Sequence, residues 1–172
     1  MNWINSGDFT VNWSFRIDAL TSVMLVVVTT VSACVHLYSV GYMNDDKSIN
    51  RFMGYLSLFT FFMLLLVTSN NLLQMFFGWE GVGLCSYLLI GFWHHKDSAN
   101  KAAIKAFILN RVGDFGFILG IVGVFFIFGS INFDVIFTDA IKYNNHVFNF
   151  LGLSLSTIDT LCFLLFIGAM GK

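Results

Sequence analysis

The chain has 172 residues, of which 57% are hydrophobic and 17% aromatic, while only 11% are charged. A soluble domain carries roughly a quarter of charged residues, so this composition predicts an integral membrane protein. A net charge of −1 argues against a nucleic-acid partner. The three cysteines lack metal-ligand or disulfide-framework spacing, so we expect neither a metal site nor a disulfide framework.

Residues 1–16 are polar with interleaved aromatic side chains, and we expect an outside-facing surface loop or a short strand there. Four apolar stretches that are long enough to cross a bilayer as helices follow, at 17–43, 52–68, 71–93 and 101–129. Asp18 is expected to cap the first of them. An outside loop of mixed character, 130–157, leads to a fifth apolar stretch, 158–172. The sequence thus predicts an all-α integral membrane protein, a bundle of about five transmembrane spans with the last incomplete.

Basic residues indicate how these spans are oriented, because they concentrate in the loops that stay inside. The loops between the first and second spans and between the third and fourth, with the start of the fourth, hold Lys47, Arg51, Lys96, Lys101 and Lys105. The opposite side holds Arg16 and Lys142. We therefore expect these two loops on the cytoplasmic or matrix side and the N-terminus on the periplasmic or intermembrane-space side.

Glu80 lies near the middle of the third span, in a run from Leu72 to Gly91 without another charge. An ionisable group there costs several kcal/mol, so it usually faces a protein or water-filled interior and marks an ion path. Burial favours the neutral carboxyl and a nearby cation favours the carboxylate, which are the properties of a proton-binding site. The alternative is a carboxyl that is protonated or paired only to hold two helices together.

Arg111 and Asp114 are three residues apart in the fourth span, in NRVGDFGF. Residues at this spacing lie on one face of a helix, so the two can neutralise each other as a structural pair. The alternative is that Asp114 also reaches a second cation on a neighbouring span. Gly116 and Gly120 give a GxxxG spacing, which favours close helix packing.

Three further ionisable residues lie in apolar segments. Lys172, at the end of LLFIGAMGK, can load and release a proton if it is buried, or belongs to a loop if the chain continues. Lys105 either extends to the basic side or serves as a proton entry group. His36 is either a hydrogen-bonded packing residue or a proton relay, for which its intrinsic pKa is suited.

Two long segments, RFMGYLSLFTFFMLLLVTSNNLLQMFFGWEGVGLCSYLLIGFW and NKAAIKAFILNRVGDFGFILGI, together with LLFIGAMGK, resemble chain 5 of proton-pumping NADH:quinone oxidoreductase, respiratory complex I. The resemblance runs from about residue 17 to 121 and resumes in the fifth span. It implies an antiporter-like membrane-arm subunit, built from inverted repeats with ion sites near the midplane.

The resemblance also implies roles for single residues. Glu80 of GWEG is similar to the family's essential glutamate, and Lys172 of GAMGK to its paired lysine on a broken helix. Arg111 and Asp114 match the ion pair beside them, and His36 matches a histidine of the family pattern.

The sequence has no haem motif, iron–sulfur motif or Gly-rich phosphate loop, so we expect no redox cofactor in this chain. The resemblance implies that FMN, iron–sulfur clusters, NADH and quinone are bound elsewhere in such a complex. The implied partners are other membrane-arm subunits, a second polypeptide carrying the rest of chain 5, and the lipid bilayer. The mitochondrial inner membrane is the favoured location, with a bacterial plasma membrane as the alternative. Two other functions remain open, namely a subunit of a monovalent cation/proton antiporter and a non-transporting structural remnant.

Overall fold

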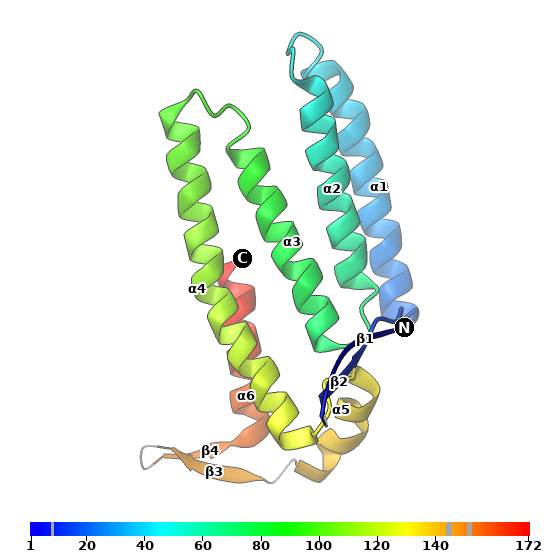
Figure 1. Cartoon of the computed structure of the whole chain (residues 1–172), viewed down its shortest axis with the longest axis vertical. Helices are drawn as coiled ribbons and strands as arrows, with labels where there is room; N and C mark the ends of the chain where they lie inside the picture. The colour runs from blue at the N-terminus through cyan, green and yellow to red at the C-terminus, as the bar shows by residue number, and fades with distance from the viewer. Residues whose placement is uncertain (8, 144–145, 151–152) are drawn as a thin grey trace. The chain divides into compact units, whose positions relative to one another are not determined.

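A computed structural model describes residues 1–172 apart from 8, 144–145 and 151–152. The chain forms two compact units. The terminal unit consists of residues 1–13, 71–73 and 108–172, and the central unit of residues 14–70 and 74–107. The α-helices are α1 (Ala19–Tyr42), α2 (Ile49–Val67), α3 (Leu72–Ile90), α4 (Asp97–Phe128), α5 (Phe133–Asp139) and α6 (Thr157–Gly171) (Figure 1).

Four of these helices, α1 to α4, are long and apolar enough to cross a membrane. The chain contains no proline, so nothing of that kind interrupts their hydrogen-bond ladders. The shorter α6 is apolar as well. The predicted all-α membrane bundle is therefore confirmed, and α1 to α4 and α6 each begin and end within a few residues of the expected spans. The largest difference is at α4, which begins at Asp97 instead of 101, with an acidic residue in its first turn where the helix dipole favours it.

Local hydrogen bonds fix where the helices begin and end. Asp18 caps α1, as predicted, and its carboxylate accepts the backbone N–H of Thr21 at 2.8 Å. Ser156 caps α6 through the backbone N–H of Asp159. Gly129 ends α4 with φ +64°, a conformation that side chains other than glycine rarely adopt.

Both segments that were expected as outside loops contain secondary structure. Residues 1–16 include an antiparallel hairpin of β1 (Asn2–Ser6) and β2 (Phe9–Asn12), with Gly7 at φ +60° after β1. The stretch 130–157 holds α5, a 3₁₀ turn η1 (Ala140–Tyr143), and a second hairpin of β3 (Val147–Phe150) and β4 (Leu153–Ser156). Short alternating strands give weak sequence signals, which explains why the sequence predicted only a loop or one short strand.

Each unit is held together by its own internal contacts and hydrogen bonds. In the terminal unit, the β1–β2 hairpin contacts α4 through edge-to-face packing of Phe9 on Phe125, and Asn71 Nδ2 donates to the Asn12 carbonyl at 2.8 Å. In the central unit, α1 and α2 run side by side (Figure 1). There the backbone N–H of Arg16 donates to the carbonyl of Thr68, which joins the start of α1 to the end of α2.

Candidate functional site

Glu80 lies on α3 in the central unit, at a level where α2 and α3 are in close contact. A Cβ atom added at Gly78 would lie 2.7 Å from the backbone nitrogen of Leu66 on α2. A Cβ atom added at Gly81 would overlap the ring of Phe62 on the same helix. Glu80 stands between these two glycines and is half-buried. The glycines that flank it in the sequence therefore allow helix contact at the level of an ionisable group.

In the terminal unit, α4 and α6 are packed along a line of glycines. A Cβ atom added at Gly113 would lie 2.8 Å from the Cα atom of Gly171, so the two backbones touch. Further along, Gly116 faces Ile167 and Gly120 faces Leu165. The GxxxG face that the sequence indicates is the face on which α6 packs (Figure 1).

The contact of Gly113 with Gly171 places two of the predicted site residues at one level. Asp114 directly follows Gly113 on α4, and Lys172 directly follows Gly171 at the end of α6. Asp114 is buried, with 3% of its surface exposed, whereas Lys172 is exposed. Arg111 lies on α4 less than one turn before Asp114 and is exposed. The structure thus brings Arg111, Asp114 and Lys172 into one region of the terminal unit.

Glu80 belongs to the other unit, so the pairing of Glu80 with Lys172 stays a prediction. The spacing of Arg111 and Asp114 predicted a common helix face, yet the two side chains differ in exposure. A long arginine side chain can leave the face on which its Cα atom lies, and this freedom allows one residue of such a pair to be buried and the other exposed.

His36 on α1 is the centre of a polar cluster inside the central unit. Its Nε2 atom lies 3.2 Å from Ser57 Oγ on α2, and its Nδ1 atom lies 2.8 Å from the carbonyl of Ser32. Ser32 Oγ in turn lies 2.7 Å from Thr60 Oγ1. Hydrogen bonds of this kind can serve a packing residue or a proton relay, so both interpretations of His36 stay predictions.

Three partners of this cluster, Ser32, Ser57 and Thr60, were not identified from the sequence. The signal was present, because Ser32 lies four residues before His36 and Ser57 lies three residues before Thr60, so each pair shares a helix face. A cavity of about 480 Å³ borders the cluster and is otherwise lined by apolar side chains of α1 and α2 and by Leu89.

Lys105 is exposed on α4 within the central unit. It lies two residues before Phe107, whose ring lies 5.5 Å from that of Tyr87 on α3. Both interpretations of Lys105, extension toward the basic side and proton entry, stay predictions.

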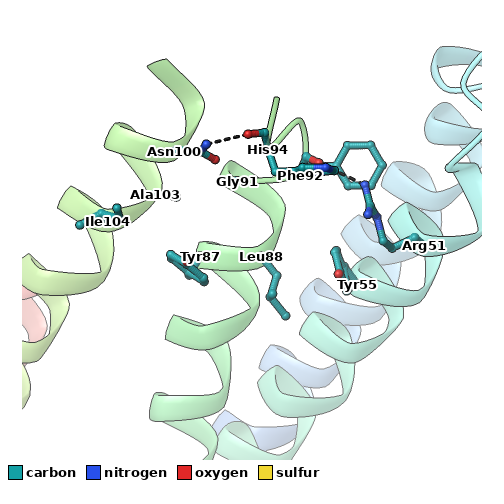
Figure 2. A pocket seen from close by; sticks show the side chains of 10 residues that line it. All are labelled: Arg51, Tyr55, Tyr87, Leu88, Gly91, Phe92, His94, Asn100, Ala103 and Ile104. Atoms are coloured by element: carbon teal, nitrogen blue, oxygen red, sulfur yellow. Dashed lines mark hydrogen bonds between the residues drawn. The ribbon is translucent and has the colours of Figure 1, made fainter. Parts of the chain in front are cut away.

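The α1–α2 and α3–α4 loops, which we expect on the basic side, are joined by a hydrogen bond. The indole N–H of Trp93 donates to Asp46 Oδ2 at 3.1 Å, and the backbone N–H of Ser48 donates to Asp46 Oδ1 at 2.7 Å. These two hydrogen bonds hold the pKa of the Asp46 carboxyl below its usual value, with smaller contributions from Arg51 and His95. A pocket of about 400 Å³ lies nearby and is lined by residues of α2, α3, α4 and the α3–α4 loop (Figure 2).

Among the residues that the structure describes, no group of three histidine, cysteine or acidic side chains is placed to hold a metal ion. The ionisable residues of the apolar helices can bind protons and form ion pairs.

Comparisons with known proteins show the family to which the chain belongs. Residues 3–53 match the family model for the N-terminus of NADH-ubiquinone oxidoreductase (complex I) chain 5, and residues 69–172 match the model for the transmembrane region of NADH:quinone oxidoreductase and Mrp antiporters.

Individual relatives are similar over nearly the whole chain. The chain is 59% identical over 171 residues to NADH-quinone oxidoreductase subunit L of Rickettsia felis, which covers 99% of this chain and 26% of the relative. It is 54% identical over 172 residues to NADH-ubiquinone oxidoreductase chain 5 of Chondrus crispus, covering 100% of this chain and 26% of the relative. It is 55% identical over 171 residues to chain 5 of Arabidopsis thaliana, covering 99% of this chain and 25% of the relative. The chain therefore spans about a quarter of the length of these relatives, and it belongs to the family of antiporter-like membrane subunits of NADH:quinone oxidoreductase, complex I chain 5.

Proposed function

We propose that this chain is part of a proton-translocating membrane-arm subunit of an NADH:quinone oxidoreductase. The observation that carries the proposal is the placement of Asp114 and Lys172 on two apolar helices, each directly after one of two glycines whose backbones touch. A buried carboxyl and an amine at one level of a membrane bundle are costly, and such groups usually belong to an ion path.

In the proposed mechanism, Lys172 takes up a proton when the charge state of Asp114 favours a cation and releases it when the pairing of Asp114 changes. Arg111 would bias this exchange, and Glu80 would be a separate proton-binding carboxyl in the central unit. Two unit charges about 4 Å apart interact by ~4 kcal/mol at an effective dielectric constant of about 20. A change of partner is therefore large enough to load or release a proton.

The chain would carry no redox group, so electron transfer would take place in other subunits of the complex. Its partners would be the remaining membrane-arm subunits, a polypeptide that supplies the rest of chain 5, and the lipid bilayer. The basic loops after α1 and α3 support an orientation with these loops in the matrix or cytoplasm and the β1–β2 hairpin on the opposite side. Relatives from both mitochondria-bearing organisms and bacteria leave either an inner mitochondrial or a bacterial plasma membrane as its location.

The test is the Glu80→Gln variant in the assembled complex, in inverted membrane vesicles. We expect proton uptake driven by NADH, followed with a pH-sensitive dye, to be abolished or strongly reduced, because glutamine cannot carry the proton or the charge. Asp97→Asn is the matched control, since Asp97 is an exposed acid in the first turn of α4. Full proton uptake by the Glu80→Gln complex would refute the proposal, provided that native gels show normal assembly.

A second candidate is a subunit of a monovalent cation/proton antiporter, because the family model that matches residues 69–172 also describes Mrp antiporters. Native gel separation of a mild detergent extract, with staining for NADH dehydrogenase activity, distinguishes the two. Peptides of this chain in a large active band support the oxidoreductase. Migration elsewhere, with proton flux driven by a sodium gradient in vesicles, supports the antiporter. Absence of both activities would support the third function, a non-transporting structural remnant.

A further inference from the structure

The pocket at the basic end of the central unit has no part in the proposed proton path. It has a volume of about 400 Å³ and lies where α2 begins, α3 ends and α4 begins (Figure 2). All the residues that line it belong to the central unit.

Arg51 lines this pocket, and two contacts with Phe92 orient its exposed side chain. Its Nη2 atom donates to the carbonyl of Phe92 at 3.2 Å, and its Cζ atom lies 4.8 Å from the centre of the Phe92 ring. The Phe92 ring is itself packed edge-to-face against Phe52 and Tyr55. A guanidinium has five N–H donors, and the hydrogen bond to Phe92 uses one of them. Arg51 is therefore a pre-oriented cation with donors to spare, which suits a phosphate group.

The electrostatic surroundings of the pocket favour an anion. None of the ten described residues that line it is acidic. Asp46 lies on the same end of the unit, but its carboxylate already accepts hydrogen bonds from Trp93 and Ser48. At this end of the unit, basic residues outnumber acidic ones, with Lys47, Lys96, Lys101 and Lys105 against Asp45, Asp46 and Asp97. The Lys96 Nζ atom lies 4.9 Å from the centre of the Trp93 ring.

The other residues that line the pocket include both polar and apolar side chains, which suits an amphiphilic ligand. Asn100, whose amide donates to the carbonyl of His94 at 2.6 Å, and the two tyrosines Tyr55 and Tyr87 provide polar groups. Leu88 and Ile104 provide apolar surface on the membrane-spanning helices α3 and α4. Aromatic and basic side chains at helix ends mark the depth of lipid head groups in a membrane.

We propose that this pocket binds the phosphate group of an anionic phospholipid, with Arg51 as its principal ligand and the first part of an acyl chain against Ile104. The inference concerns the pocket alone, so it can fail while the proposed proton function holds, and the reverse is also true.

The experiment measures lipid binding to the purified, delipidated protein by native mass spectrometry. Phosphatidylglycerol and phosphatidylcholine with the same acyl chains are the two probes. We expect clear preference for the anionic lipid, and Arg51→Gln should weaken its binding about ten-fold, the effect of losing one charge-assisted hydrogen bond. Lys142→Gln is the control, because Lys142 is an exposed basic residue on the terminal unit that pairs with Asp139. Equal affinity of the Arg51→Gln variant and the unchanged protein would overturn the proposal.

A second pair of variants tests the proposal even if the Arg51→Gln variant does not fold. Ile104 is 51% exposed, so a polar side chain is tolerated better there than in the core. Ile104→Glu places a negative charge at the pocket, while Ile104→Gln has the same size without the charge. The proposal requires weaker phosphatidylglycerol binding in the first than in the second. Inorganic phosphate at millimolar concentration tests the source of the anion, because displacement of the lipid by phosphate alone would show a soluble-phosphate site and would overturn the lipid assignment.

Discussion

The seam between α4 and α6 and the seam between α1 and α2 hold apolar helices together in two different ways. In the terminal unit, Gly113 and Gly171 let two backbones touch, and no side chain lies between them. In the central unit, α1 and α2 are joined by hydrogen bonds among Ser32, His36 and Ser57 and a hydroxyl of Thr60. Lipid tails are as apolar as leucine, so burial alone does not drive helices together in a membrane; close packing and hydrogen bonds do.

The difference matters for function because the two seams differ in rigidity. A backbone contact can yield only if a whole helix moves, so Asp114 and Lys172, which follow the touching glycines, keep their relative level. Hydroxyl groups and an imidazole can rotate and exchange donor and acceptor roles without moving their helices. The glycine seam, between α4 and α6, is thus suited to hold charged groups in place. The polar seam, between α1 and α2, is suited to rearrange hydrogen bonds.

Among the variants that test this difference between the two seams, Gly113→Ala is expected to cause the largest loss of stability. Its Cβ atom would meet the backbone of Gly171 at 2.8 Å, and backbone atoms cannot rotate away. Overpacking of this kind costs about 1–3 kcal/mol. Unfolding by SDS in mixed micelles, followed by circular dichroism, measures the loss.

Gly54→Ala on α2 is the matched control for this substitution, because nothing lies within 4 Å of a Cβ atom at Gly54. Alanine is a better helix former than glycine, so this variant should gain up to about 1 kcal/mol. Opposite signs for the two variants support the glycine seam, whereas equal shifts in one direction would mean that close contact at Gly113 contributes nothing.

A smaller effect is expected from Ser57→Ala in the polar seam. The substitution removes one partner of His36, and side-chain hydrogen bonds between membrane helices contribute about 0.6 kcal/mol on average. Thr29→Val is the control, since the Thr29 hydroxyl donates only to backbone carbonyls of its own helix. Both variants are measured by the same SDS unfolding. A loss for Ser57→Ala as large as that for Gly113→Ala would show that the two seams do not differ in the way we infer.

Much of this architecture could be predicted from the sequence, and the reason is the membrane. Long apolar runs without proline leave only helices as an option, so the four spans were identified from composition and length. The capping role of Asp18 and the packing face at Gly116 and Gly120 follow from local spacing, and the structure agrees with both.

What could not be predicted depends on contacts between segments that are distant in the sequence. The contact of Gly113 with Gly171 joins residues of two helices, and no local pattern reports which glycines will meet. The same holds for the bond between His36 and Ser57, and for the tie between Asp46 and Trp93, which joins two loops. Candidate site residues could therefore be proposed from residue type and local spacing, but the residues that contact them on other segments could not.

The smallest expected effect concerns the hydrogen bond between Asp46 and Trp93 at the basic end, which joins the α1–α2 loop to the α3–α4 loop. The backbone N–H of Ser48 and the indole of Trp93 lower the pKa of the Asp46 carboxyl in the folded protein. A group with a lowered folded pKa contributes stability that is fully present above its unfolded pKa of about 3.9 and is lost as the pH falls through the folded value. The indole N–H signal of Trp93 in NMR spectra, assigned with Trp93→Phe, should therefore stay unchanged from pH 7 to about 4 and shift only below about 3.9. Asp46→Asn, which keeps an accepting oxygen but cannot titrate, should remove that transition, and a midpoint at or above the usual aspartate value would show that these hydrogen bonds do not hold the loops together.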